Sequence, residues 1–213
     1  MNYSVSIANQ LSTYLTNNDW NFDFDEEKGL FRFALKMRNK LRSIDYNIKV
    51  RDDSYIVYAT SPISPDEDDP EQMSAVAEFV CRANFGLPCG CFEFDFTDGE
   101  TRYRYAIDCR ERTLSNDIIE DSIRTPSVIF KRYGNGLIDV IFNQTSPEQA
   151  VKTSEKGNVA VIRHFLTEVM QSENPDQELM ARLSACLENM GEHDNEDMTI
   201  KVDPFASEGG EEL

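Results

Sequence analysis

Basic residues are scarce in this chain. Its 213 residues include 21 lysines and arginines against 39 aspartates and glutamates, so the formal net charge is -18. Such a charge repels the phosphate backbone of nucleic acids and the anionic surface of membranes. We therefore expect neither a nucleic acid nor a membrane to be a direct partner of this protein.

Residues and motifs that enzymes use to hold metals or phosphates are also few. The two histidines, His164 and His193, have no second ligand at the spacing of a zinc site. The sequence contains no P-loop, no G-x-S-x-G motif and no G-x-G-x-x-G motif. The acidic run at residues 66–69 lacks the alternating order of a calcium-binding loop, and compensation of a helix dipole explains it better. We predict a protein that is not an enzyme and has no metal and no other cofactor.

Long apolar runs are missing as well. No segment reaches the length of a membrane span, and residues 1–5 have neither the basic start nor the apolar core of a secretory leader. The five cysteines are an odd number, which favours reduced thiols over a disulfide framework. These features predict a cytoplasmic protein.

A hairpin is the clearest pattern that the sequence contains. Apolar and charged residues alternate over residues 91–96 and 101–107, on either side of Asp98-Gly99. A period of two places the aromatic residues, Phe96 among them, on one face and the charged residues on the other. Asp-Gly is typical of a short turn, so we predict an antiparallel pair with one solvated face. Ion pairs across the strands are predicted among Glu93, Asp95, Arg102 and Arg104.

Periodicity predicts the other elements. Helices are predicted over residues 5–15 and 70–86, and a third begins after Ser115 as its N-cap. Pro126 is predicted to kink or restart the third helix, and Gly134-Asn135-Gly136 to break it. Strands are predicted near residues 20–24, 31–35, 46–50 and 55–58. The predicted fold class is α+β, an antiparallel sheet of about five strands packed by helices in the order helix, strands, helix, hairpin, helix.

Two segments carry a family resemblance. AEFVCRANFGLPCGCFEFDFTDGETRYRYAID at residues 77–108 and TSPEQAV at residues 145–151, together with the order of elements, resemble the YbjN family of sensory transduction regulators over roughly residues 5–151. The resemblance implies a bacterial protein whose fold is similar to that of class I type III secretion chaperones, which are small, acidic and usually dimeric. It therefore implies a homodimer, and it implies no catalytic residues.

Three regions follow from these patterns. Residues 1–151 are predicted to form the YbjN-like α+β domain, residues 152–190 a helical hairpin, and residues 191–213 an acidic disordered tail. The apolar stripes of the hairpin either pack on the core or a dimer mate, or form a groove for a partner. A docking motif around residues 202–205 is the alternative to a solvated tail. The candidate partner-binding residues of the hairpin are Phe165, Leu166, Leu183 and Leu187.

Two functions remain open on the sequence alone. The first is a protein-interaction module, chaperone-like or a regulatory adaptor, that binds another protein or itself. The alternative is a small-molecule or stress sensor with a pocket between the sheet and the helix at residues 70–86.

Cys89 and Cys91 are candidate reactive thiols. Their C-x-C spacing differs from the usual C-x-x-C motif, and small residues at a joint between helix and strand are the simpler interpretation. An enzymatic role would require a depressed thiolate pKa at one of them.

Overall fold

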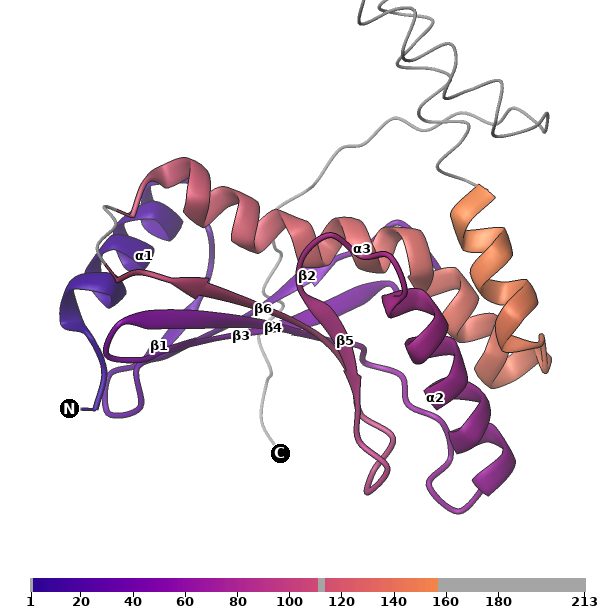
Figure 1. Ribbon diagram of the computed structural model, residues 1–213. Helices are drawn as coiled ribbons and strands as arrows, with labels where there is room; N and C mark the ends of the chain where they lie inside the picture. The colour runs from indigo at the N-terminus through magenta and orange to yellow at the C-terminus, as the bar shows by residue number, and fades with distance from the viewer. Residues whose placement is uncertain (1, 111–113, 157–213) are drawn as a thin grey trace, which may run out of the picture.

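A single antiparallel sheet organises the molecule. The computed structural model describes residues 2–110 and 114–156, and over these residues it confirms the α+β class (Figure 1). The sheet has six strands, where about five were predicted, and the strand predicted near residues 20–24 is the short segment Asp23–Asp25. The elements are α1 (Val5–Asn17), β1 (Asp23–Asp25), β2 (Leu30–Lys36), β3 (Ser43–Val50), β4 (Ser54–Thr60), α2 (Pro70–Asn84), β5 (Cys91–Phe94), β6 (Thr101–Asp108) and α3 (Asn116–Asn143).

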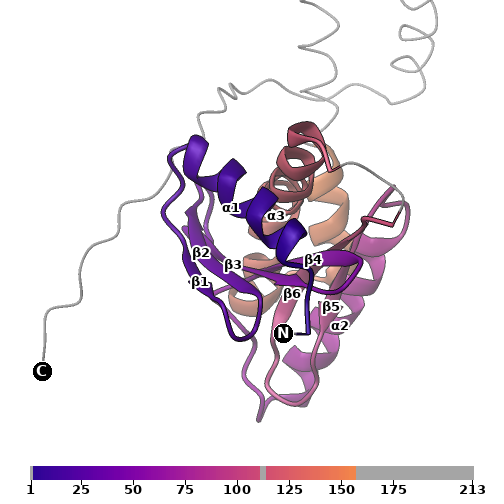
Figure 2. The ribbon, with the colours of Figure 1, turned by 90° about the vertical axis from the view of Figure 1, so that its left-hand side faces the viewer.

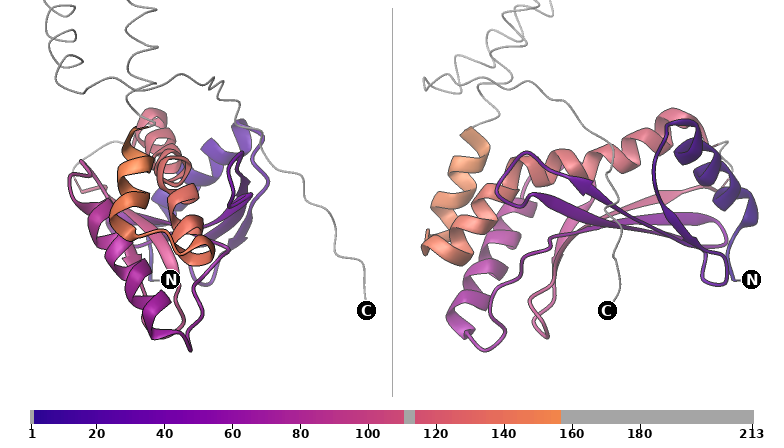
Figure 3. Two further views of the ribbon diagram at one scale, coloured as in Figure 1. Left: turned by 90° about the vertical axis from the view of Figure 1, so that its right-hand side faces the viewer. Right: turned by 180° about the vertical axis from the view of Figure 1, so that it is seen from behind.

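The sheet has one covered and one open face. Its strand order is β1-β2-β3-β4-β6-β5, and every neighbouring pair is antiparallel. The helices lie on one side of it, with α3 across the sheet, α1 beside the start of α3 and α2 beside its end (Figures 1, 2 and 3). In β2, β3 and β4 buried residues alternate with more exposed ones, as a half-covered sheet requires.

The helices begin where the sequence predicts. Ser4 caps α1 and Ser115 caps α3, each accepting a hydrogen bond from the backbone three residues on. Asp69 accepts from the backbone N–H groups of Glu71 and Gln72, so the acidic run does cap α2. After α2 the chain turns at Gly86, whose φ is +91°.

The predicted break in the third helix is wrong. Helix α3 runs without interruption from Asn116 to Asn143 and contains both Pro126 and the Gly134-Asn135-Gly136 segment. A Cβ at Gly134 would lie 2.6 Å from Cδ1 of Leu41, and the side chain of Asn135 accepts from the Lys40 backbone N–H at 2.9 Å. The segment therefore serves close packing of the β2–β3 turn against an intact helix, which local periodicity does not reveal.

Aromatic side chains fill the space between α2 and the sheet. The Phe79 ring meets Tyr133 edge-on at 6.4 Å, and Phe92 meets Phe130 and Tyr133 edge-on at 5.3 and 6.0 Å. Edge-to-face contacts of this kind stabilise a packed core. The region where the sequence suggested a sensor pocket is thus occupied by these rings.

The central hairpin is shorter than predicted. Strand β5 ends at Phe94, and Phe96 lies in the turn with 65% of its surface exposed, so its predicted place on the covered face is wrong. A six-residue turn follows because Asp95 accepts from the backbone N–H of Thr97, which ends the strand.

Residues 147–156 are helical and cross the boundary predicted at residue 151. Ser146 accepts from the Gln149 backbone N–H, as an N-cap does, and Ala150 and Val151 are buried against the domain. The predicted helical hairpin and acidic tail lie otherwise outside the described residues.

Candidate functional site

The outer edge of β2 is only partly covered. Strand β1 pairs with β2 from Leu30 to Arg32 and no further. Gly29 accepts from the Val50 N–H, and Met37 donates to Arg42, so the odd-numbered residues of β2 bond to β3. The backbone groups of Ala34 and Lys36 consequently face outward. No described residue bonds to them there, and both residues are exposed.

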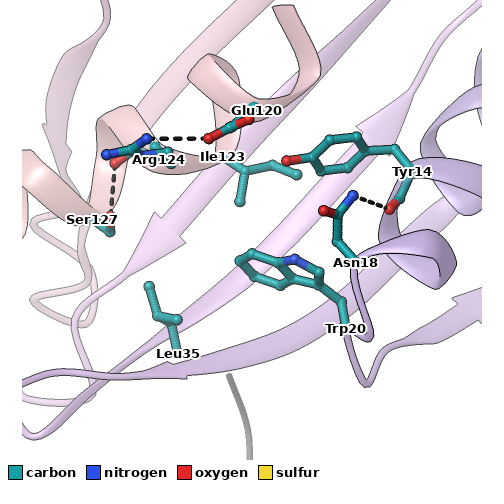
Figure 4. A pocket seen from close by; sticks show the side chains of 8 residues that line it. All are labelled: Tyr14, Asn18, Trp20, Leu35, Glu120, Ile123, Arg124 and Ser127. Atoms are coloured by element: carbon teal, nitrogen blue, oxygen red, sulfur yellow. Dashed lines mark hydrogen bonds and ion pairs between the residues drawn. The ribbon is translucent and has the colours of Figure 1, made fainter. Parts of the chain in front are cut away.

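A pocket lies beside this edge. Its volume is about 360 Å³, and it is bounded by the end of α1, by β2 and by α3 (Figure 4). Residues far apart in the sequence meet here because α3 crosses back over the start of the sheet. The lining residues are Tyr14, Asn18, Trp20, Leu35, Glu120, Ile123, Arg124 and Ser127.

The floor of the pocket is apolar. Leu35 and Ile123 are buried, and the half-buried Trp20 ring meets Phe33 at 5.2 Å with the planes 69° apart. The Trp20 backbone N–H donates to the Leu15 carbonyl at 2.9 Å, which fixes the residue after the helix end. The floor can therefore receive an apolar side chain or ring.

The rim of the pocket is polar. Arg124 donates to Glu120 at 3.1 Å, and the Ser127 hydroxyl donates to the Arg124 carbonyl at 2.7 Å. Burial raises the pKa of Tyr14, the negative charge of Glu120 raises it further, and Arg124 opposes them. The Tyr14 hydroxyl therefore keeps its proton and remains a hydrogen-bond donor.

Positive charge gathers along this part of an otherwise acidic chain. Four of the seven residues from 36 to 42 are basic. Lys131 lies one turn beyond Ser127 on α3, and its pKa is lowered by burial and then by the positive charge of Arg38. Asn39 holds the turn against α3 by donating to the Phe130 carbonyl at 2.9 Å.

We call this combination the edge site. It consists of the outward backbone groups of Ala34 and Lys36, the adjacent pocket, and the cations Arg38, Arg124 and Lys131.

The predicted reactive thiols lie on the other edge of the sheet. Cys91 belongs to β5, and its thiol is 3.7 Å from the guanidinium Nη2 of Arg104. The Cys89 carbonyl accepts a hydrogen bond from the Tyr103 hydroxyl. Both cysteines are free, and neither is near the edge site. Their reactivity stays a prediction.

The charged face of the hairpin is paired as predicted for Glu93, Arg102 and Arg104, but not for Asp95. Glu93 accepts from Arg102 at 2.9 Å and from Arg104 at 2.5 Å, and Arg102 also lies over the Tyr58 ring at 4.5 Å. Asp95 instead caps the turn. These contacts stabilise the open face of the sheet. Glu93, Arg102 and Arg104 are all used in ion pairs there, so none of them is set up as a catalytic acid or base.

Four candidate partner-binding residues, Phe165, Leu166, Leu183 and Leu187, lie outside the described residues. The sequence reasoning missed the edge site. The basic cluster at residues 36–42 is a signal that could have pointed to it, whereas the meeting of Trp20 with Arg124 depends on tertiary packing.

A second pocket, of about 310 Å³, lies between β6 and the start of α3. Tyr105, Cys109 and Leu114 line part of it. Burial and then the charges of Asp108 and Asp53 raise the pKa of the Cys109 thiol, so this thiol is kept protonated and is a poor nucleophile.

Within residues 2–110 and 114–156, no group of three or more His, Cys, Asp or Glu side chains is arranged to hold a metal. Among the helices of the described part of the chain, none is both long and apolar enough to cross a membrane.

Comparisons with known proteins add a fold likeness. No protein-family model matches the chain, and no curated protein does. Among solved structures, the chain is similar to YbjN from E. coli, described as a proposed transcription regulator, with a TM-score of 0.43 and 9% identity over 60% of this chain and 90% of that one. YbjN is also the family that the sequence resembles. This likeness concerns the fold alone.

Proposed function

We propose that this protein is a non-enzymatic protein-interaction module, chaperone-like or a regulatory adaptor, that binds an extended segment of another protein at the edge site. The observation that carries the proposal is the outward backbone of Ala34 and Lys36 beside an apolar pocket. An added strand would bond to these groups, and every second side chain of the strand would point toward the pocket.

The chemistry of the site specifies the bound segment. The apolar floor favours an apolar side chain, and Lys131, which has no ion pair with another described residue, favours acidic residues beside it. Backbone bonds supply affinity and the pocket supplies selectivity. The bound segment is therefore extended, with an apolar residue flanked by Asp or Glu.

Cytoplasmic location and a homodimer belong to the same proposal. The four described cysteines are free thiols, which suits a reducing compartment. The homodimer rests on the family resemblance of the sequence. Light scattering at micromolar concentration tests it, and a monomer would contradict it.

Selection from a random peptide display library on the full-length protein tests the binding of a segment. Enriched peptides should alternate an apolar residue with acidic ones and should change the fluorescence of Trp20, the single tryptophan. In Ala34→Pro the outward N–H is absent and no described bond to β3 is lost, so affinity should fall about tenfold or more. Ala34→Val keeps the N–H and is the matched control. Equal binding to both variants would contradict the proposal.

A small-molecule or stress sensor is the second candidate. The apolar floor and converging polar rim of the 360 Å³ pocket favour it. A compound that raises the unfolding temperature and changes Trp20 fluorescence, with equal effect in Ala34→Pro, would support a sensor over a strand-binding module.

A further inference from the structure

The Tyr14 hydroxyl is a hydrogen-bond donor that has no partner among the described residues. Tyr14 is 7% exposed, and its hydroxyl points into the pocket between α1, β2 and α3 (Figure 4). The neighbouring Asn18 side chain donates to the Tyr14 carbonyl at 2.8 Å and not to the hydroxyl. A buried donor without an acceptor costs free energy. The pocket is therefore suited to a group that accepts a hydrogen bond from Tyr14.

The walls of the pocket favour an aromatic ring. Trp20 lines the pocket, and aromatic rings pack on one another with centroids about 4.5–7 Å apart. Arg124 also lines it, and a guanidinium is attracted to the face of a ring. Of the three large aromatic side chains, phenylalanine has no acceptor and tryptophan has only a donor, whereas the tyrosine hydroxyl both accepts and donates. Tyrosine therefore matches this pocket best.

The register of an added strand brings one side chain to the pocket. The outward groups of Ala34 and Lys36 would bond to two residues of the strand, and the residue between those two would lie opposite Leu35. In an antiparallel pair of this type the Cα atoms are about 4.5 Å apart and both side chains lie on the same face. Leu35 lines the pocket, so the side chain opposite it would enter the pocket. Antiparallel pairing is expected because all neighbouring strands of the sheet pair in this way.

Lys131 lies beyond the pocket in the direction of the β2–β3 turn. It is one helical turn past Ser127, about 6 Å along α3, and Asn39 of the turn donates to the carbonyl of the preceding Phe130. In an antiparallel added strand, the residue two positions before the one at the pocket would lie opposite Met37, about 7 Å toward the same turn. Lys131 is half-buried and has no ion pair with another described residue, so a carboxylate at that position would be attracted to it.

We propose that the segment bound at the edge site runs antiparallel to β2 and inserts a tyrosine side chain into the pocket opposite Leu35, with Asp or Glu two residues before it beside Lys131. The proposal rests on the proposed function, because the same strand edge holds the segment. The Tyr14 hydroxyl would donate to the inserted tyrosine oxygen, and the inserted hydroxyl would donate to Oδ1 of Asn18. The recognised sequence is therefore Asp-Xaa-Tyr or Glu-Xaa-Tyr in an extended segment.

The random peptide library, displayed against the full-length protein, tests the choice of side chain. Peptides enriched on the wild type should contain Asp-Xaa-Tyr or Glu-Xaa-Tyr. Selection on Tyr14→Phe should give phenylalanine as often as tyrosine at that position, because the donor is absent. Tyr105→Phe, which removes a hydroxyl from the second pocket, is the matched control and should keep the preference for tyrosine. Enriched peptides without a preference for tyrosine on the wild type would overturn the proposal.

Titration calorimetry with a synthetic copy of the most enriched peptide tests the contact with Tyr14. Replacing the peptide tyrosine by phenylalanine should weaken binding to the wild type about fivefold or more and should leave binding to Tyr14→Phe unchanged. The phenylalanine peptide should bind the wild type and Tyr14→Phe equally, which confirms that the variant is folded and its edge intact. An equal loss on both proteins when the peptide hydroxyl is removed would overturn the proposal.

The order of the two residues tests the direction of the strand. A peptide with the acidic residue two positions after the tyrosine should bind the wild type about threefold more weakly than the enriched order. The two orders should bind Lys131→Gln equally. Lys152→Gln, in which the lysine lost is paired with Glu148, is the matched control and should still discriminate. Equal binding of both orders to the wild type would overturn the placement of the acidic residue beside Lys131.

The Ala34→Pro variant separates failure of this proposal from failure of the proposed function. If Ala34→Pro weakens binding of the enriched peptides but tyrosine is not preferred, only the tyrosine pocket is refuted. If no peptide is sensitive to Ala34→Pro, both proposals fall. If both are right, the same peptides should lose affinity in Ala34→Pro and in Tyr14→Phe.

Discussion

The two edges of the sheet differ in whether their outward backbone groups are hydrogen-bonded. At β5, the Asn84 side chain from the end of α2 accepts from the Phe92 N–H at 2.7 Å and donates to the Phe92 carbonyl at 2.9 Å. One amide thus satisfies both outward groups of Phe92, as a neighbouring strand would, while the outward groups of Phe94 have no bond to a described residue. At β2, the corresponding groups of Ala34 and Lys36 have no bond to a described residue. An unpaired edge is a template for another strand, so the difference marks where this protein is open to association.

The surroundings of the two edges differ in charge as well. Near β5 the arginines are paired with Glu93, whereas near β2 the positive charge of Arg38 adds to burial in lowering the pKa of Lys131. The arginines of the closed edge are neutralised by Glu93, whereas Lys131 near the open edge has no ion pair with another described residue. The unbonded backbone groups of Ala34 and Lys36 and the positive charge of Lys131 therefore mark the same edge of the sheet.

Substitution at the entrance to β5 should have the largest effect on the closed edge. Gly90 has a φ of +64°, and a Cβ there would lie 2.5 Å from the Tyr103 hydroxyl oxygen and 2.8 Å from the Arg104 carbonyl oxygen. Gly90→Ala should lower the free energy of unfolding by about 3 kcal/mol, measured by chemical denaturation. In Gly86→Ala the φ is also positive but no atom lies within 4 Å, so this control should lose only about 1 kcal/mol. Equal losses would show that the Tyr103 contact is unimportant.

Removal of the amide cap should open the closed edge. Asn84→Ala leaves both outward groups of Phe92 unpaired, and we expect a loss of about 2 kcal/mol in the free energy of unfolding. Asn84→Asp keeps the acceptor for the Phe92 N–H but loses the donor to the Phe92 carbonyl. Its loss in the free energy of unfolding should therefore be no larger than that of Asn84→Ala. Faster exchange of the Phe92 amide in Asn84→Ala is the second measurement. Unchanged exchange would contradict the role of Asn84 as the edge cap.

The strands and helix caps can be predicted from the sequence, whereas the capping of the β5 edge by Asn84 cannot. Alternation in β2, β3 and β4 and the caps at Asp69 and Ser115 are local signals, and they correctly predict the elements. Asn84 reads locally as an ordinary residue near a helix end, because its partner lies eight residues on in β5.

Contacts distant in the sequence explain the remaining errors. In the sequence Gly134 predicts a helix break. In the structure its lack of a Cβ leaves room for the side chain of Leu41, 93 positions away (134 − 41). The edge site joins Trp20 to Arg124 only because α3 crosses the sheet. Side-chain packing between distant elements decides these features, and a periodic pattern does not contain it.

Alkaline pH should loosen the closed edge through Tyr103. Burial, followed by the neighbouring Cys89 and Cys91, raises the pKa of this hydroxyl above its ordinary value of 10.0. The folded state therefore holds the proton more tightly, so its contribution is fully present below pH 10 and is lost as pH rises through the raised pKa. Tyr103→Phe should lose about 1 kcal/mol at neutral pH with the bond to the Cys89 carbonyl. Its stability should then fall less steeply above pH 10 than that of the wild type, and an equal slope would contradict this account.

The smallest effect is expected at the open edge itself. Proline at position 34 removes an N–H that bonds to no described residue, and it also restricts the unfolded chain. Ala34→Pro should therefore change the free energy of unfolding by less than about 1 kcal/mol, by chemical denaturation, against about 2 kcal/mol for Asn84→Ala. A loss above about 2 kcal/mol in Ala34→Pro would mean that the outward N–H already supports the fold, and the two edges would then be equivalent. A small loss in stability with a large loss in peptide binding is the result that separates an edge kept for association from an edge closed for stability.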